Sequence, residues 1–425
     1  MTAGPSRLEQ VAEALQRLLT WREAADQCLS VYFREHPKLG ARDRAQIAQA
    51  CFDVLRHLRR YRHDAQMARG PLEQLLAARG LHATLDASAR QTVLPAHLLD
   101  WAEQCVAIDP ASLPVGLRYS LPDWLIPVIE DLPEGFSYAA ALLQQAPLDL
   151  RVNTLKATRD DVLEQIKAML GDRAVQALAT PYSPDGIRLS GHAPVNRWGL
   201  FEQGLVEVQD EGSQLLAHLV GPKRGEMVID FCAGAGGKTL ALGALMRSTG
   251  RLYAFDVSAA RLAKAKPRLA RSGLSNVYPV TIRHERDDRV ARLKAKAHRV
   301  LVDAPCTGLG TLRRNPDLKW RQSGQELERL CEQQASILSQ AARCVRPGGL
   351  LVYATCSFLP QENERQIERF LAAHPDFALQ NAAELLPDNV KMATEPDGLL
   401  RLRPDREGTD GFFAAAMRRN LGGAD

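Results

Sequence analysis

The fold of this chain is decided by the stretch Met227-Val-Ile-Asp-Phe-Cys-Ala-Gly-Ala-Gly-Gly-Lys-Thr239. Its apolar start predicts a short buried strand that ends at Asp230, and its glycines predict a tight turn that leads into a helix. The same order recurs downstream, where residues 252–255 predict a strand and residues 259–270 predict a helix. Two more short buried strands are predicted, at 300–302 and 350–353. Such alternation is typical of a parallel, doubly wound α/β sheet, which binds ligands at the carboxyl ends of its strands.

Two smaller regions are predicted before this sheet. Apolar residues recur at helical spacing in residues 1–125, which predicts a helical bundle. Residues 126–203 predict a small α/β module, and residues 204–425 predict a Rossmann-like catalytic domain. The bundle contains an arginine group that we interpret either as a solvated helix face or as an RNA-contacting face, namely Arg56, Arg59, Arg60 and Arg62.

Composition excludes several classes of protein. The chain has 425 residues, of which 45% are hydrophobic and 24% charged, so it is neither disordered nor embedded in a membrane. It contains no apolar run long enough to span a bilayer, and its first ten residues lack the apolar core of a signal peptide. Eight cysteines without zinc-ligand spacing predict free thiols and no metal site. We therefore expect a cytoplasmic protein.

The glycine loop is compatible with only some nucleotide ligands. A phosphate-binding P-loop needs glycine where this chain has Cys232, and the dinucleotide fingerprint needs glycine or alanine where it has Thr239. A Gly-x-Gly turn after a first strand suits S-adenosylmethionine, although a purely structural turn would read the same way. Asp256 ends the next strand, where a carboxylate can accept hydrogen bonds from both ribose hydroxyls.

Two cysteines follow other predicted strands of the sheet. Asp303 and Cys306 come directly after residues 300–302, and Cys356 comes shortly after residues 350–353. A single cysteine in such a place is more often a small buried residue than a reactive one. Two cysteines on different strands of one ligand-binding sheet, with an aspartate beside them, favour a chemical role.

Three motifs carry a resemblance to a known family. The stretches Cys232-Ala-Gly-Ala-Gly-Gly-Lys-Thr239, Asp303-Ala-Pro-Cys306 and Ala354-Thr-Cys-Ser357 resemble signature motifs of the RNA cytosine-5 methyltransferases, in the branch of the bacterial 16S rRNA methyltransferase B. Further segments that agree with this branch are 208–213, 314–320 and 409–413. Residues 151–155 resemble its small module, and the N-terminal helices resemble its antitermination-factor-like RNA-binding bundle.

The chain departs from the family pattern at two places. Ala235 stands where the family usually has proline, a change that we expect the loop to tolerate. After the third strand, at 277–282, the family has an aspartate near the adenine, whereas this chain has His284 with Asp287 nearby. Either of these two residues could make that contact.

The resemblance implies a reaction and a role for each motif. The chain is expected to methylate carbon 5 of a cytosine in RNA with S-adenosylmethionine, through a covalent bond between Cys356 and carbon 6. Cys306 would release the product or act as general base, Asp303 would contact the base, and Lys238 would orient Asp303 or add positive potential. The expected cofactor-binding residues are Cys232, Ala233, Gly234, Ala235, Gly236, Gly237, Lys238, Asp256 and Asp303.

The charge distribution fits a nucleic-acid partner. Residues 258–299 contain twelve lysines and arginines and three acidic residues, a net charge of +9. A basic group follows, with Trp320 available for stacking: Arg313, Arg314, Lys319 and Arg321. We interpret these residues as a phosphate-tracking surface, with a solvated helix face as the alternative.

We expect a monomer that acts on 16S rRNA, without a membrane or a metal. The alternatives are a tRNA or 23S rRNA cytosine-5 methyltransferase, and an RNA-binding ribosome-assembly factor whose catalysis is dispensable.

Overall fold

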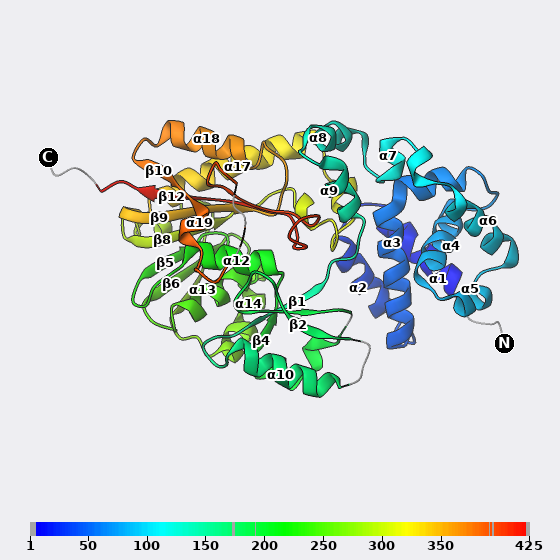
Figure 1. The fold of residues 1–425 in the computed structure, drawn as a ribbon, viewed down its shortest axis with the longest axis horizontal. Coiled ribbons are helices and arrows are strands. Elements are labelled where there is room, and N and C mark those ends of the chain that lie inside the picture. The colour runs from blue at the N-terminus through cyan, green and yellow to red at the C-terminus, as the bar shows by residue number, and fades with distance from the viewer. Residues whose placement is uncertain (1–5, 172–174, 192, 391, 393–394, 422–425) are drawn as a thin grey trace. The chain divides into compact units, whose positions relative to one another are not determined.

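The structure is a computed structural model that describes residues 6–171, 175–191, 193–390, 392 and 395–421 (Figure 1). By its internal contacts the chain forms two compact units. The first unit comprises Met1–Gln145 together with Thr311–Gly324, and the second comprises Ala146–Gly310 together with Gln325–Asp425. The three-part division at 125 and 203 stays a prediction, although helices α8 and α9 beyond residue 125 belong to the first unit.

The first unit is helical. Its longer helices are α1 (Arg7–Leu18), α2 (Ala25–Glu35), α3 (Ala41–Ala65), α4 (Leu72–Thr84), α5 (Ala87–Val93), α6 (Ala96–Ala107) and α9 (Gly135–Leu142). Its shorter helices are α7 (Val115–Arg118), α8 (Ile126–Asp131) and α16 (Leu318–Arg321). Helix α1 begins with a capping box, in which the Ser6 hydroxyl accepts the N–H of Glu9 and the Glu9 carboxylate accepts the N–H of Ser6.

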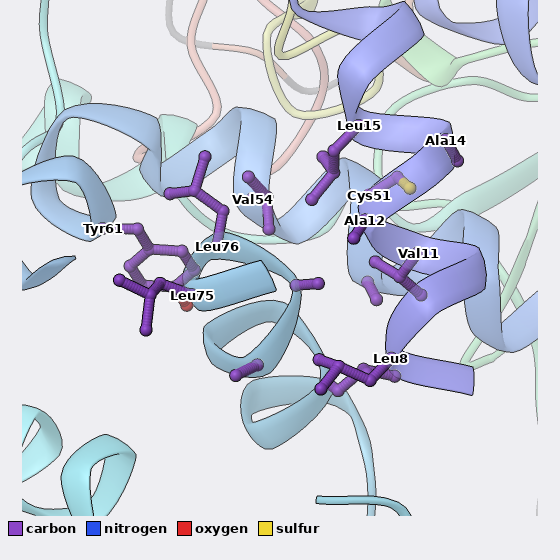
Figure 2. Packing of buried hydrophobic residues seen from close by; sticks show 14 of the residues in the cluster. Leu8, Val11, Ala12, Ala14, Leu15, Cys51, Val54, Tyr61, Leu75 and Leu76 are labelled. Carbon is purple, nitrogen blue, oxygen red and sulfur yellow. The ribbon is translucent and has the colours of Figure 1, made fainter. Parts of the chain in front are cut away.

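The core of this unit lies between α1, α3 and α4 (Figure 2). Leu8, Val11 and Leu15 of α1 recur at helical spacing and are buried against side chains of the other two helices. Figure 2 shows Val54 of α3 and Leu76 of α4 in the same cluster. The predicted helical bundle is therefore present.

The arginine group of α3 is mostly neither a solvated face nor a free RNA-contacting face. Arg56 donates to the carbonyl of Arg313 at 2.9 Å, and Arg59 donates to the carbonyl of Leu121 at 2.6 Å. Arg60 is paired with a buried carboxylate of its own helix at 2.8 Å. Only Arg62 of the four is exposed. Three of the four residues are thus engaged within the helical unit, and an RNA contact stays a prediction.

The predicted stacking role of Trp320 is also corrected. Its indole N–H donates to the carbonyl of Leu55 at 2.7 Å, and its ring packs against the core of the helical unit. Lys319 is only 3% exposed and donates from Nζ to the carbonyl of Arg56 at 2.8 Å. Arg313 is buried as well. Arg313, Lys319 and Trp320 therefore belong to the packing of the helical unit rather than to a phosphate-tracking surface, whereas Arg321 is exposed, so its predicted phosphate contact stays a prediction.

The second unit begins with a small antiparallel sheet in the order β2-β3-β1-β4. Its elements are β1 (Leu148–Val152), α10 (Arg159–Leu170), β2 (Ala177–Ala179), β3 (Gly186–Leu189), α11 (Gly199–Glu202) and β4 (Val206–Val208). Val162 and Ile166 of α10 are buried against Leu150 and Ile187 of the sheet. This is the small α/β module predicted from the sequence.

The rest of the second unit is a larger sheet in the order β10-β12-β9-β8-β5-β6-β7, with β11 paired to β12. The strands are β5 (Met227–Asp230), β6 (Arg251–Asp256), β7 (Val277–Thr281), β8 (Ala297–Asp303), β9 (Val345–Thr355), β10 (Phe377–Gln380), β11 (Leu400–Leu402) and β12 (Phe412–Arg419). From β9 to β7 all neighbours are parallel. Strand β12 runs antiparallel to β9 and to β10, so the sheet is mixed and not wholly parallel as predicted.

Helices cover both faces of this sheet (Figure 1). They are α12 (Glu211–Val220), α13 (Gly237–Leu245), α14 (Ala259–Ser272), α15 (Asp288–Ala291), α17 (Gly324–Ala342), α18 (Glu364–Ala373) and α19 (Ala382–Leu385). Helices α12, α13 and α19 pack against one face and α17 and α18 against the other. The predicted Rossmann-like α/β class is confirmed. Among the described helices, none has both the length and the apolar character needed to cross a bilayer.

Candidate active site

Strand alternation brings three reactive side chains to one face of the sheet. Val228, Leu301 and Ala354 all contribute to the core beneath α12 and α13. Side chains two residues apart in a strand share a face, so Asp230, Asp303 and Cys356 lie on that same face. Since the carboxyl ends of parallel strands meet at one edge, these groups lie side by side at the edge predicted from the sequence.

The glycine loop between β5 and α13 has the backbone that its sequence requires. Gly234 has φ of 55° and Gly236 has φ of 81°, a region that residues with a side chain rarely adopt. A Cβ at Gly234 would meet no atom within 4 Å, so the loop borders open space. Asp256, at the end of β6, accepts the N–H of Gly234 at 2.8 Å and that of Ser258 at 2.7 Å. Asp256 therefore fixes the loop as well as facing the predicted ribose site.

Asp230 is a deeply buried carboxyl group of the site, at 1% exposure. The Thr239 hydroxyl donates to Oδ2 at 2.6 Å, whereas Oδ1 has no hydrogen-bond partner among the described residues. Burial raises the pKa of Asp230 to about 7. In the sequence Asp230 marks only the end of a strand, because the neighbouring residues do not distinguish a buried carboxylate from a helix cap.

Lys238, at the start of α13, pairs with Asp303. Its Nζ donates to Oδ2 of Asp303 at 2.7 Å, and the ring of Phe412 lies 5.6 Å from the same nitrogen. Burial alone would lower the pKa of Lys238, but the attraction and hydrogen bond of Asp303 raise it, with a further contribution from Cys356. Lys238 is therefore a cation held beside both Asp303 and one of the two cysteines.

These residues fit the predicted S-adenosylmethionine. Asp303 and Asp256 both act electrostatically on Asp230, so three carboxyl groups gather around a single ammonium group, Lys238. Asp256 and Asp303 can attract a ligand with a sulfonium and an ammonium group, with Arg261 3.9 Å from Asp256, and the loop offers this ligand open space.

The two predicted cysteines face one another. The Sγ atoms of Cys306 and Cys356 lie 3.4 Å apart, and both residues are half-buried free thiols. The hydrogen bond to Cys356, burial, and the charge of Glu362 raise the pKa of Cys306 well above its ordinary value. Cys306 is thus a thiol at neutral pH and can donate its proton toward the Cys356 sulfur.

A buried carboxylate that the sequence analysis missed supports this pair. Glu362 is fully buried and accepts the N–H of Thr307 at 2.8 Å, its hydroxyl at 2.5 Å, and the amide of Gln334 at 2.9 Å. The same Gln334 amide donates to the carbonyl of Pro305 at 2.9 Å, so the residues on both sides of Cys306 are fixed. In the sequence Glu362 lies in a charged stretch that reads as solvated surface, so no local signal could have identified it.

The backbone after Cys356 is also closely constrained. Gly310 donates its N–H to the carbonyl of Cys356 at 2.9 Å and accepts the N–H of Gly411 at 2.8 Å. A Cβ at Gly310 would lie 2.1 Å from the carbonyl oxygen of Gly411, which only glycine avoids.

The two residues considered for the adenine side have different environments. Asp287 is buried and caps α15, where it accepts the N–H of Arg283 at 2.9 Å and the guanidinium of Arg289. These partners lower its pKa well below the ordinary value, led by the Arg289 hydrogen bond. His284 is exposed and accepts the N–H of Arg286 at 3.2 Å. Asp287 is thus engaged within its own loop, and His284 lies at the surface.

The basic region 258–299 divides into two groups. Nine side chains are exposed, namely Arg261, Lys264, Lys266, Arg283, Arg286, Arg289, Arg292, Lys294 and Lys296. The other three are partly buried in ion pairs, Arg268 and Arg271 with Glu207, and Arg299 with Glu226. No cluster of three or more metal-ligating side chains occurs among the described residues.

Comparison with known proteins agrees with this geometry. Residues 217–418 match the family described as 16S rRNA methyltransferase RsmB/F, and residues 121–196 match the ferredoxin-like domain of RsmF/B-like methyltransferases. A probable ribosomal RNA small subunit methyltransferase B from Synechocystis is 35% identical over 319 residues, which cover 73% of this chain and 70% of that protein.

Two solved structures are also similar. The crystal structure of PH0851 has a TM-score of 0.78 and 26% identity, and the match covers 99% of this chain and 100% of that chain. A methyltransferase homologue from Pyrococcus horikoshii has a TM-score of 0.61 and 28% identity, covering 73% of this chain and 100% of that chain.

These matches confirm the predicted family, fold class and S-adenosylmethionine cofactor. The identity and coverage relative to the Synechocystis protein, together with the matched catalytic region, lead to one assignment: this chain is a member of the 16S rRNA methyltransferase RsmB/F family.

Proposed function

We propose that the protein methylates carbon 5 of a cytosine in 16S rRNA, with Cys356 as the nucleophile. The observation that carries this proposal is the pair of thiols at the ends of neighbouring parallel strands, with their sulfur atoms 3.4 Å apart and Lys238–Asp303 beside them. An unreactive structural cysteine requires neither a second thiol nor a buried ammonium group. The names of the relatives support small-subunit ribosomal RNA as the substrate.

The first step is attack of the Cys356 thiolate on carbon 6 of the cytosine. Carbon 5 is too weakly nucleophilic to take a methyl group while the ring is aromatic, and the new S–C6 bond moves the electrons of the C5=C6 bond toward carbon 5. Asp303 accepts a hydrogen bond from the exocyclic amino group of the base, and Lys238 holds Asp303 in place. S-adenosylmethionine supplies the methyl group that carbon 5 then takes up.

The second step is removal of the carbon 5 proton. Once the Cys356 sulfur is bonded to carbon 6 it carries no charge, so the hydrogen bond and repulsion of Cys356 no longer raise the pKa of Cys306, and only burial and Glu362 still do. Cys306 then releases its proton to solvent and accepts the carbon 5 proton. The electrons of the C5–H bond restore the C5=C6 bond, and Cys356 leaves as a thiolate. The target base must be unpaired or flipped out for this attack to occur.

Substitution of each cysteine tests the chemistry. Cys356→Ala is expected to abolish methyl transfer without loss of RNA binding. Cys306→Ala is expected to accumulate a covalent protein–RNA adduct, seen as a shifted band on a denaturing gel. Cys28→Ala, a half-buried cysteine of the helical unit, serves as the control and should leave both readouts unchanged. Unchanged methylation in Cys356→Ala would remove this residue from the nucleophile role.

The RNA is tested separately from the mechanism. Bisulfite sequencing of total RNA from a deletion strain should show loss of a methylated cytosine in 16S rRNA. If the methylated cytosine is lost from tRNA or 23S rRNA instead, the proposed reaction stands but the substrate is a different RNA. A strain that carries Cys356→Ala and assembles ribosomes normally while lacking the modification would favour the assembly-factor alternative, in which catalysis is dispensable.

A further inference from the structure

The cofactor loop is held from outside by an arginine of the neighbouring helix. Nη1 of Arg268, in α14, donates to the carbonyl of Ala235 at 2.7 Å. Ala235 stands between Gly234 and Gly236, the two loop glycines with positive φ. It lies in the turn that Gly236 closes by donating its N–H to the carbonyl of Ala233 at 2.9 Å. The Arg268 hydrogen bond thus restrains the backbone of this turn.

Arg268 is itself fixed by the small α/β module. Its Nε donates at 3.0 Å to Glu207 of β4, a residue only 5% exposed. The other oxygen of Glu207 accepts Nη2 of Arg271 at 2.6 Å. Arg151 lies opposite Glu207 in the β1–β4 ladder and is drawn to it electrostatically, although burial lowers the pKa of Arg151 to about 10. Glu207 is therefore a buried anion that orients Arg268 toward the loop.

The small α/β module packs so closely against α14 that it fixes the place of Arg268. A Cβ at Gly204 would lie 2.1 Å from the carbonyl oxygen of Arg271, so the two backbones nearly touch. The Asn153 amide donates to the carbonyls of both Gly204 and Ser272 at 2.9 Å. The carboxyl-terminal half of α14 cannot shift without breaking these bonds.

We propose that Arg268 is a positioning residue for the S-adenosylmethionine loop, and that the small α/β module fixes it through Glu207. The module thereby contributes to cofactor affinity without contacting the cofactor. This inference concerns cofactor binding alone and does not depend on which base or RNA is methylated.

Two matched substitutions test the proposal. Arg268→Met and Arg271→Met each remove one guanidinium from Glu207 and leave the other, but only Arg268 bonds to the loop. Arg268→Met should weaken S-adenosylmethionine binding by about three- to tenfold. The lost hydrogen bond orders the loop rather than contacting the ligand, so only part of its free energy affects binding. Arg271→Met should change the dissociation constant by less than about twofold. Binding is measured by calorimetry on the full chain without RNA, and the melting temperature without ligand reports folding.

A rescue separates loop positioning from general damage. The N–H of Ala235 has no hydrogen-bond acceptor among the described residues, and its φ is not positive, so Ala235→Pro removes no bond. Ala235→Pro should restore most of the affinity that Arg268→Met loses. Equal losses in Arg268→Met and Arg271→Met, or no rescue by Ala235→Pro in a folded Arg268→Met protein, would overturn the proposal.

Discussion

Cys306 and Cys356 are 50 residues apart in the chain, yet their sulfur atoms lie 3.4 Å from one another. They meet because β8 and β9 are parallel neighbours whose last residues are in register, with Asp303 opposite Ala354. Cys306 lies three residues after the end of β8, and Cys356 lies one residue after the end of β9. Both cysteines are therefore at the same edge of the sheet.

This distance predicts sensitivity to oxidation. A mild thiol oxidant such as diamide should join Cys306 and Cys356 in a disulfide, with the two thiol protons passing to the oxidant as it is reduced. Methyl transfer should stop and return on treatment with dithiothreitol. Mass spectrometry should find a loss of about 2 Da in a cross-linked peptide pair. A Cys306→Ala protein should lack this cross-link, and a wild-type protein that stays fully reduced under diamide would contradict the prediction.

Asp230 predicts that stability falls as pH rises. Its pKa is about 7 in the folded chain, because of burial, and lower in the unfolded chain, so the folded state holds the proton more tightly. The free energy of unfolding therefore falls as the pH rises from about 4 to about 7, and it falls no further because of Asp230 at higher pH.

Asp230→Asn should accordingly stabilise the protein more at pH 8.5 than at pH 5, by about 2 kcal/mol between these values. Urea unfolding at each pH measures the difference. Asp288→Asn, at an exposed carboxylate, is the control and should show the same small effect at both values. A gain from Asp230→Asn that does not vary with pH would contradict a raised pKa.

Lys319 predicts the opposite pH dependence in the helical unit. Burial, aided by the charge of Arg56, lowers the pKa of Lys319 to about 7, whereas in the unfolded chain it is that of an ordinary lysine. The unfolded state binds the proton more tightly, so stability rises as pH increases from about 7 to about 10. Lys319→Met should stabilise the protein most below pH 7 and progressively less at higher pH, as measured by the denaturation midpoint. Lys264→Met, at an exposed position, should show no such trend.

Gly310 predicts a steric requirement beneath the active site. Gly310→Ala places a methyl group 2.1 Å from the Gly411 carbonyl oxygen, so the segment that also holds the Cys356 carbonyl must move. We expect a loss of about 1–3 kcal/mol in stability, together with a lower rate of methyl transfer. Gly324→Ala is the matched control, because a Cβ there meets no atom within 4 Å. Equal stability and activity in the two variants would show that the segment adjusts freely.

The residues of the site could be predicted from the sequence, but their partners could not. The motifs located Cys306, Cys356, Asp303 and the glycine loop, because a residue that follows a parallel strand must lie at the edge where ligands bind. The antiparallel strands at the β12 edge were not predicted, since the pairing partner of a short apolar run is not encoded locally. The buried network around Glu362 was missed for a related reason, because a charged stretch gives no sign that one of its members is buried.

By itself the sequence determined the class of fold, the glycine loop and the edge at which two thiols and an aspartate gather. These features follow from the alternation of strands and helices and from where each residue falls relative to a strand end. Only the tertiary structure decided which charged side chains remain exposed to bind a partner. Lys319 and Arg56 donate hydrogen bonds within the helical unit, and Arg268 donates one to the glycine loop. The physical reason is that a hydrogen bond or a burial cost depends on groups distant in the chain, whereas periodicity and turn chemistry depend on near neighbours.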